Sequence, residues 1–239
     1  MKVDIMREAY HVENQLDQPF CYQISVSDAV SIRYRRKGHE LDLKPLKKVI
    51  LSPQSLIDGK CENNALPLLR EPYGLQTREV YPFTMTKPGV DDEIVLRYDD
   101  TKPKFTVKSM VEYWDPTTFK SILEENFGNP EKRNPMIGAM KMGSYIHWNS
   151  FAPYSHRAIV RDYPGLLREL KKEPLHAMVI VGIDTDEGNN NCVVKNSYGY
   201  GWGKDGFGQV NISDLHSIEE IEIPDNNDYL SNLAERLKN

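Results

Sequence analysis

The 239-residue sequence contains only three cysteines, Cys21, Cys61 and Cys192. This small, odd number excludes the dense disulfide framework that stabilises many secreted domains. The sequence also lacks the pattern of a secretory signal peptide, a positively charged start followed by an apolar segment. These two absences predict a reducing compartment, the cytoplasm or the nucleus. The alternative is a vacuolar, lysosomal or secreted protein from which an upstream presequence has been removed.

Long apolar runs and excess positive charge are absent as well. No apolar stretch is long enough to span a membrane as a helix, so no membrane partner is expected. The formal net charge is −5 and the only basic cluster is Arg33–Lys37, so no nucleic-acid partner is expected. Charged residues at 27% and apolar residues at 39% are typical of a globular protein, which at this length forms one unit or two small lobes.

The most informative feature is a predicted β-hairpin near the C-terminal end. Its three parts are the apolar run Met178–Ile183, the turn residues Asp186–Asn191 and the apolar run Cys192–Val194. Folding this segment about residue 186 places His176 opposite Asn196, and directly opposed side chains lie about 5 Å apart. An asparagine that orients a histidine is half of a Cys-His-Asn nucleophilic site. The alternative for His176 is a hydrogen-bonded core histidine.

A candidate nucleophile, Cys21, stands at the start of a predicted helix. Apolar residues recur there at helical spacing: Tyr22, Val26, Ala29, Val30 and Tyr34. Gly38 is the predicted stop of this helix. In the first turn, free N–H groups and the helix dipole favour a thiolate at Cys21, and the amide of Gln15 can donate to an oxyanion formed nearby. The alternative for Cys21 is a packed thiol without chemistry.

Further elements are predicted along the chain. A helix is expected with Ser52 as N-cap, and another with Asp115 as N-cap and proline at its first position. Residues 84–104 are expected to form a long irregular connector. The spacing of three leucines near the C-terminus predicts a short amphipathic helix: Leu230, Leu233 and Leu237. The polar segment 141–172 is interpreted as a surface loop, the alternative being that it borders the substrate.

Three segments together resemble papain-like cysteine proteases of the papain and cathepsin type. Asn14–Ser25 matches the N-Q-x5-C-W-x2-S segment of this family, with Tyr22 in place of tryptophan. Leu175–Gly182 is similar to its histidine strand, and Asn196–Phe207 matches its N-S-W-G-x-G-W-G-x-x-G-[YF] run. Weaker similarities lie between them, at Leu51–Asp58 and at Tyr81–Phe83. The resemblance spans roughly residues 3 to 212.

The resemblance implies an α+β, papain-like two-lobed fold with the active-site cleft between the lobes. Residues 1–110 would form the helical lobe that carries the nucleophile helix. Residues 111–239 would form the antiparallel, β-barrel-like lobe with the histidine–asparagine hairpin, ending in a polar tail from about residue 225. The implied activity is that of an endopeptidase acting through a thioester. Its residues would be the nucleophile Cys21, the base and later acid His176, the orienting Asn196 and the oxyanion donor Gln15.

The resemblance also implies a set of substrate-binding residues: Asn63, Asn64, Ala65, Leu66, Ala139, Ala177 and Tyr198. Those resembling the pocket for the second residue before the cut are small or apolar, so an apolar substrate residue is expected there. Tyr198 stands where the family has a tryptophan that shields the histidine–asparagine hydrogen bond. The implied partners are a peptide or protein substrate and a protein inhibitor. A monomer without metal or cofactor is expected.

Several departures from the family pattern favour a second hypothesis. Gln18 replaces the first cysteine of the C-G-S-C-W motif, so the family disulfide to the position of Cys61 is not expected. The C-N-G-G motif reads Cys61-Glu-Asn-Asn64, and Asn64 adds a side chain where a glycine lets substrate approach. The opening Val3–Ile5 resembles mature family members, so no inhibitory prosegment is expected. The alternative function is a weak or inactive protease-like protein that binds peptides or proteins. Acyl transfer to an acceptor other than water stays open.

Overall fold

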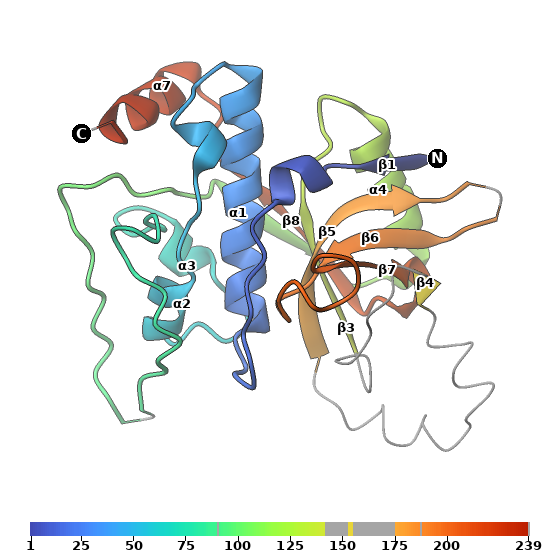
Figure 1. The fold of residues 1–239 in the computed structure, drawn as a ribbon, viewed down its shortest axis with the longest axis horizontal. Coiled ribbons are helices and arrows are strands. Elements are labelled where there is room, and N and C mark those ends of the chain that lie inside the picture. The colour runs from blue at the N-terminus through green and yellow to red at the C-terminus, as the bar shows by residue number, and fades with distance from the viewer. Residues whose placement is uncertain (90, 142–152, 155–174, 187, 239) are drawn as a thin grey trace. The chain divides into compact units, whose positions relative to one another are not determined.

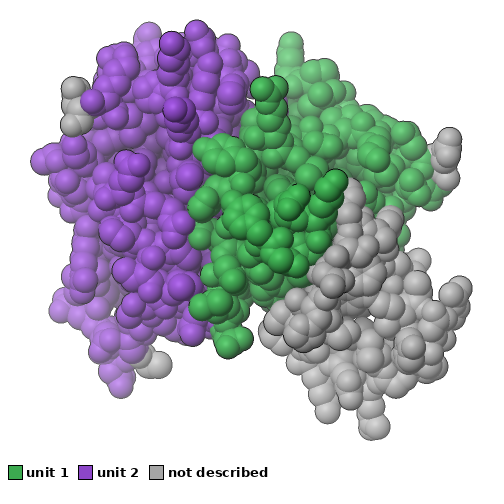
Figure 2. Space-filling view, in the orientation of Figure 1, with its two compact units in different colours: residues 1–17, 111–220 green, residues 18–110, 221–239 purple. Residues whose placement is uncertain are grey.

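The structure is a computed structural model that describes residues 1–89, 91–141, 153–154, 175–186 and 188–238 (Figure 1). It divides into two compact units, coloured separately in Figure 2. Unit 1 comprises residues 1–17 and 111–220, and unit 2 comprises residues 18–110 and 221–239. The expected lobes were residues 1–110 and 111–239. The two units differ from them because residues 1–17 and residues 221–239 each belong to the opposite unit. The first residues pair with a strand of unit 1, and the last residues belong with the helices of unit 2.

Unit 1 is built around a mixed sheet (Figure 1). Its strands in the described residues are β1 Lys2–Asp4, β2 Ser109–Tyr113, β3 Met136–Lys141, β4 Pro153–Tyr154, β5 Leu175–Asp184, β6 Asn191–Lys195, β7 Phe207–Asn211 and β8 Ser217–Glu222. The order is β2-β8-β3-β5-β6-β7-β4, with β1 added on β5. The ends of this order, β2 and β4, do not pair with each other, so the sheet of the described residues is open. The predicted α+β class is confirmed.

The other elements of unit 1 are the helix α4 Pro116–Gly128 and the 3₁₀ helices η1 Met6–Ala9 and η4 Ile212–Asp214. Helix α4 begins as predicted, because the carboxylate of Asp115 accepts a hydrogen bond from the backbone N–H of Thr117 at 3.0 Å. Its buried face carries Phe119, Leu123 and Phe127. These side chains contribute to the apolar core of unit 1.

The β5–β6 hairpin has a different register from the predicted one. Val179 pairs with Lys195, and continuing this register places Tyr198, not Asn196, opposite His176. The prediction of directly opposed His176 and Asn196 is therefore wrong. The physical cause is the position of the turn: Asp184 pairs with Asn191, so the turn is centred beyond residue 187 and not at residue 186. A bulge between Ile180 and Gly182 adds a residue to β5 and shifts the register back by one position, toward the predicted one.

Unit 2 contains the helices α1 Cys21–Glu40, α2 Gln54–Asp58, α3 Leu66–Leu69 and α7 Asn227–Arg236, and the 3₁₀ helix η2 Leu46–Lys48. Helix α1 continues two residues beyond Gly38, so the predicted stop at this glycine is wrong. A Cβ at Gly38 would lie 2.8 Å from the Cβ of Leu46, so the glycine permits the close approach of η2. None of the helices in the described ranges combines the length and apolarity needed to cross a membrane.

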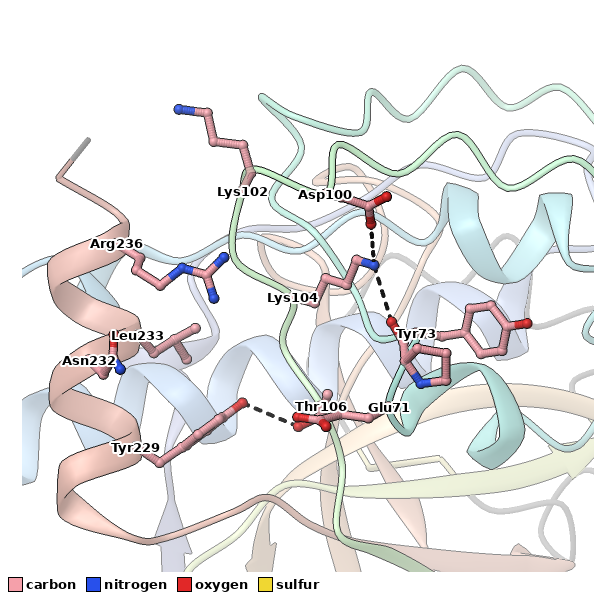
Figure 3. Close-up of a pocket in the computed structure, with 11 residues that line it drawn as sticks. Glu71, Tyr73, Asp100, Lys102, Lys104, Thr106, Tyr229, Asn232, Leu233 and Arg236 are labelled. Atoms are coloured by element: carbon pink, nitrogen blue, oxygen red, sulfur yellow. Dashed lines mark hydrogen bonds and ion pairs between the residues drawn. The ribbon is translucent and has the colours of Figure 1, made fainter.

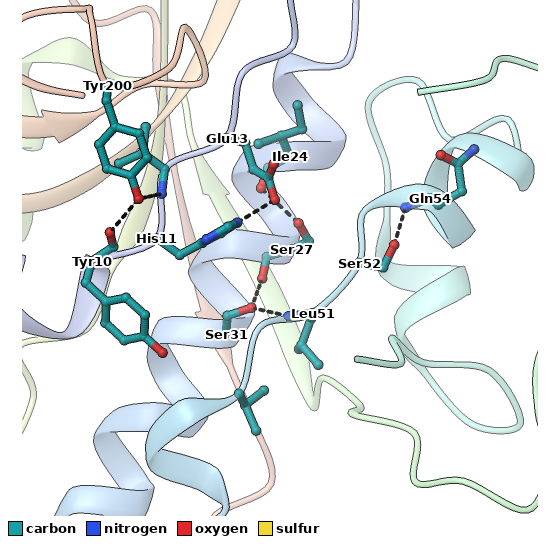
Figure 4. Close-up of polar contacts among 12 residues, drawn as sticks. Tyr10, His11, Glu13, Ile24, Ser27, Ser31, Leu51, Ser52, Gln54 and Tyr200 are labelled. Carbon is teal, nitrogen blue, oxygen red and sulfur yellow. Dashed lines mark hydrogen bonds and ion pairs between the residues drawn. The ribbon is translucent and has the colours of Figure 1, made fainter. Parts of the chain in front are cut away.

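Serine hydroxyls on the buried face of α1 connect this helix to the following segment (Figure 4). Ser27 donates to the carbonyl of Ile24 at 3.1 Å, and Ser31 donates to the carbonyl of Ser27 at 2.7 Å. The Ser31 hydroxyl then accepts the backbone N–H of Leu51 at 3.0 Å. Hydroxyls buried in this way are stable only because each has a hydrogen-bond partner.

The start of α2 lies one residue later than predicted. Ser52 still acts as a cap, because its hydroxyl accepts the backbone N–H of Gln54 at 3.1 Å (Figure 4). Pro53 occupies the N-cap position instead of the first helical position. The helix and the capping role of Ser52 were therefore predicted correctly, but the predicted start was one residue too early.

The predicted C-terminal helix is confirmed as α7. Asn226 caps it by accepting the backbone N–H groups of Asp228 and Tyr229, and the helix buries Leu230 and Leu233 within unit 2. The hydroxyls of Tyr229 and Thr106 lie 3.2 Å apart, beside a cavity of about 330 Å³ (Figure 3). This contact joins α7 to the segment of unit 2 that contains Thr106.

Substitution of Gly182 tests the pairing of β1 with β5. A Cβ at this position would lie 2.5 Å from the carbonyl oxygen of Val3, an atom of the neighbouring strand's backbone. We expect Gly182→Ala to lower the free energy of unfolding by about 1–3 kcal/mol, as overpacking does in protein cores. Urea denaturation measures this change. Gly201→Ala is the control, because its Cβ meets nothing within 4 Å; equal losses in the two variants would contradict the prediction.

Candidate active site

Unit 1 brings His176 and Asn196 into contact in spite of the shifted register. His176 Nε2 lies 2.7 Å from Asn196 Oδ1, a diagonal contact across β5 and the end of β6. The backbone N–H of Ser197 also donates to Asn196 Oδ1, at 2.8 Å, so the amide oxygen faces the ring. An oxygen only accepts, so Nε2 carries the hydrogen and donates it. In the neutral imidazole, Nδ1 is therefore the nitrogen that can take up a proton.

Tyr198 covers one face of this imidazole. The two ring centroids are 4.7 Å apart with 22° between their planes, and the tyrosine hydroxyl lies 3.2 Å from His176 Nδ1. Tyr198 therefore both stacks on the imidazole and makes a hydrogen-bond contact with Nδ1.

Gln15 is held next to the same hairpin. The segment Glu13–Gln15 runs along residues 197–199: Gln15 N–H donates to the Ser197 carbonyl at 2.8 Å, and Gly199 N–H donates to the Glu13 carbonyl at 2.9 Å. The hydroxyl of Ser197 donates to Gln15 Oε1. With its oxygen occupied in this way, the amide presents its NH₂ group as a donor. Ser197 was missed in the sequence analysis, although it directly follows Asn196.

The electrostatic setting of His176 is that of a buried base. Burial lowers the pKa of His176 to about 4, while the hydrogen bond to Asn196 acts in the opposite direction. The side chain is 6% exposed. At neutral pH the imidazole is therefore uncharged and able to accept a proton.

Cys21 lies in unit 2 as the first residue of α1, and its side chain is half-buried. The preceding residue Phe20 offers no side-chain cap to the helix. Cys21 thus stands in the first turn of a helix, as predicted. That the first-turn N–H groups and the helix dipole favour its thiolate stays a prediction. No disulfide joins the three cysteines, and Cys61 and Cys192 are both buried.

The predicted substrate-binding residues fall into two sets. In unit 1, Ala139 and Ala177 are directly paired between β3 and β5, which puts two small side chains side by side. In unit 2, Asn63 and Asn64 are exposed, Ala65 is buried and Leu66 is half-buried. The side chain of Asn64 accepts the backbone N–H of Leu66 at 3.2 Å at the start of α3. Most of segment 141–172 lies outside the described residues.

The pKa of His176 predicts a pH dependence of stability. Below its ordinary pKa of 6.5 the unfolded chain takes up a proton that the folded chain does not bind until about pH 4. Stability should therefore fall as the pH drops through this window, by up to about 3 kcal/mol from this group. Urea denaturation of wild type and His176→Gln between pH 7 and pH 4 measures it. Parallel stability curves for the two proteins would contradict the prediction.

Comparison with known proteins connects this geometry to a family. The sequence profile of the family described as "Papain family cysteine protease" matches residues 2–223. Cysteine proteinase 3 of Dictyostelium discoideum is 28% identical over 176 residues, which are 69% of this chain and 46% of that protein. Cathepsin K of Mus musculus is 22% identical over 217 residues, 86% of this chain and 57% of that protein. The chain thus spans about half the length of the curated relatives it matches.

Solved structures show the same fold. A digestive procathepsin L 3 of Tenebrio molitor larval midgut has a TM-score of 0.66 at 19% identity, covering 93% of this chain and 69% of that chain. A cysteine protease of Carica candamarcensis in complex with E-64 has a TM-score of 0.62 at 17% identity, covering 93% and 98%. The predicted papain-like fold is confirmed. Since the family profile covers nearly the whole chain, the protein belongs to the papain family of cysteine proteases.

Proposed function

We propose that this chain is a cysteine peptidase that hydrolyses peptide bonds through a thioester. Cys21 is the nucleophile, His176 the base and later the acid, Asn196 the residue that orients the imidazole, and Gln15 the oxyanion donor. The observation that carries this proposal is the state of His176. Asn196 binds its Nε2–H, which leaves Nδ1 as the proton acceptor of a neutral imidazole.

The proposed reaction starts with transfer of the Cys21 thiol proton to His176 Nδ1. The thiolate attacks the peptide carbonyl, and the Gln15 amide donates a hydrogen bond to the oxyanion of the tetrahedral intermediate. This intermediate collapses to the thioester as the leaving amine takes the proton from His176. A water molecule, deprotonated by His176, then attacks the thioester and releases the acid and the thiol.

Burial makes the intermediate imidazolium costly, so groups that stabilise it matter. The hydrogen bond from Nε2–H to Asn196 strengthens when the ring is charged. The stacked ring of Tyr198 offers its electron-rich face to the same cation, an interaction worth about 0.5–2 kcal/mol. We propose that these two residues offset part of the desolvation cost during each turnover.

The proposed substrate is a peptide or protein with an apolar residue two positions before the cut, against Ala139 and Ala177. The proposed inhibitors are E-64, which the Carica candamarcensis relative binds, and a protein inhibitor. Endopeptidase action, a monomeric state and a cytoplasmic or nuclear location, with the vacuole, lysosome or cell exterior as alternatives, stay predictions from the sequence.

A second candidate function is that of a protease-like binding module. The observation that favours it is the exposed side chain of Asn64 at a position where the family motif has a glycine. A side chain there narrows the approach of a substrate backbone. The two candidates differ in the reactivity of Cys21, so one experiment separates them.

Alkylation of Cys21 by iodoacetamide at neutral pH tests the peptidase proposal. We expect Cys21 to react at least about tenfold faster than the same cysteine in the urea-unfolded chain, because an activated cysteine is partly thiolate. His176→Ala should abolish this difference, and Cys21→Ala should abolish hydrolysis of a fluorogenic peptide. Peptide mapping by mass spectrometry identifies the labelled cysteine. Equal rates in the folded and unfolded chain would favour the binding module.

Ser197→Ala tests the support of Gln15. Without the hydroxyl that binds Gln15 Oε1, the amide can rotate and its donor is less well placed. We expect kcat for peptide hydrolysis to fall about three- to tenfold with little change in KM, as for a lost transition-state interaction. Ser213→Ala is the control, because it removes a hydroxyl that donates to the nearby Asn211 and, among the described residues, not to Gln15. A rise in KM at constant kcat would argue against an oxyanion role.

A further inference from the structure

A short segment of unit 2, residues 82–86, has two different faces and is here called the strap. Phe83 and Met85 are half-buried, whereas Pro82, Thr84 and Thr86 between them are exposed. The strap therefore presents one apolar face and one polar face.

The apolar face of the strap packs beside Cys21. Phe83 and Met85 pack against a buried cluster of Phe20, Ile24 and Ile57. Phe20 directly precedes Cys21, and the Ile24 N–H donates to the Phe20 carbonyl at 2.9 Å to form the first turn of α1. The strap thus packs against a cluster to which residues on both sides of Cys21 in sequence belong.

The polar face of the strap borders open space. Pro82, Thr84 and Thr86 line a cavity of about 650 Å³, which also reaches Asp92 and Arg97. Packed side chains normally hold a segment in place from both sides. Here the cavity replaces such packing on one side, so the position of the strap depends on other contacts.

Gln54 supplies these contacts. Its side chain is buried, 3% exposed, and its Oε1 accepts the Thr84 N–H at 3.0 Å while its Nε2 donates to the Thr86 carbonyl at 2.8 Å. The two hydrogen bonds flank Met85, whose φ of 56° is unusual for a residue other than glycine. Such a conformation persists only where the surroundings hold it.

Gln54 is itself fixed within unit 2. Its Nε2 also donates to Asp58 Oδ1 at 2.8 Å, and Asp58 Oδ2 accepts the hydroxyl of Tyr81 at 2.7 Å. Tyr81 is buried and stands directly before the strap. Gln54 is therefore a fixed point to which both ends of the strained residue are tied.

We propose that Gln54 is a positioning residue for Cys21. It holds the strap, the strap holds the first turn of α1 through Phe83 and Met85, and this turn sets the surroundings of the thiol. The expected effect on catalysis rests on the proposed function of Cys21. The contacts from Gln54 through the strap to the first turn of α1 do not depend on that function.

Gln54→Met in the full chain tests this link, because methionine keeps the length of the side chain and removes its hydrogen bonds. We expect faster amide hydrogen exchange in peptides covering residues 83–86 and 20–27. Alkylation of Cys21 by iodoacetamide should slow about tenfold, since small displacements of a reacting group cost this much or more. Unchanged exchange in residues 20–27 would overturn the proposal.

Gln76→Met is the matched control. Gln76 is also buried and makes the same kind of two-ended contact, donating to the Asp99 carbonyl at 2.6 Å and accepting the Asp99 N–H at 3.0 Å. Its loss should speed exchange around residue 99 and leave Cys21 alkylation within about twofold of wild type. If both variants slow Cys21 equally, the effect is general destabilisation and the proposal is wrong.

Met85→Ala provides a second route to the same link, because it removes the packing and keeps the hydrogen bonds of Gln54. It should also speed exchange in residues 20–27, and its failure to do so would count against the proposal. If wild-type Cys21 reacts no faster than in the unfolded chain, the proposed peptidase function fails. The exchange measurements still decide whether Gln54 positions the first turn.

Discussion

The hydrogen bond from His176 Nε2 to Asn196 Oδ1 is the contact on which the chemistry of this site depends. It selects the tautomer of the imidazole and so decides which nitrogen can take up a proton. Asn196 holds its own orientation through the Ser197 N–H. The next residues of the same run then hold Gln15 and cover the imidazole. Residues 196–198 thus select the tautomer of His176, hold the amide of Asn196, hold Gln15 and cover the imidazole.

This arrangement depends on burial, which has opposing effects. The sheet of unit 1 removes water from His176, which keeps the imidazole neutral and available as a base. The same burial makes the charged ring costly once it has accepted a proton. In the proposed mechanism, Asn196 and the ring of Tyr198 stabilise that charge through the contacts that they make with the imidazole. A tyrosine at this position covers less area than the tryptophan of the family and adds a hydroxyl near Nδ1.

Local sequence signals predicted those features that local physics controls. The cap of α4 by Asp115, the amphipathic helix α7 and the helix that begins with Cys21 follow from spacing and capping chemistry over a few residues. The contact of His176 with Asn196 was also predicted, because the histidine strand and the asparagine run are both recognisable. Its register was not, because a run of turn residues such as Asp186–Asn191 does not show where the two strands begin to pair.

The features that sequence analysis missed depend on contacts between distant residues. Gly38 was interpreted as a helix stop, but it lies inside α1, where the absence of a side chain permits the close approach of Leu46. The pairing of β1 with β5 joins residues about 180 positions apart, and no local pattern indicates it. The hydrogen bonds of Ser197 with Gln15 and of Gln54 with the strap likewise join residues that are far apart in the sequence. The sequence around Ser197 or Gln54 does not indicate which residue will be its hydrogen-bond partner.

The segment around Cys61 is held to α1 by a hydrogen bond at a place where the family pattern has a disulfide. In the family pattern a disulfide would join this position to that of Gln18. Here Gln23, on the buried side of α1, donates a hydrogen bond to the carbonyl of Cys61 instead. A buried hydrogen bond of this kind is weaker than a disulfide but does not depend on the redox state of the surroundings. The attachment of this segment to the nucleophile helix is therefore the same under reducing and oxidising conditions.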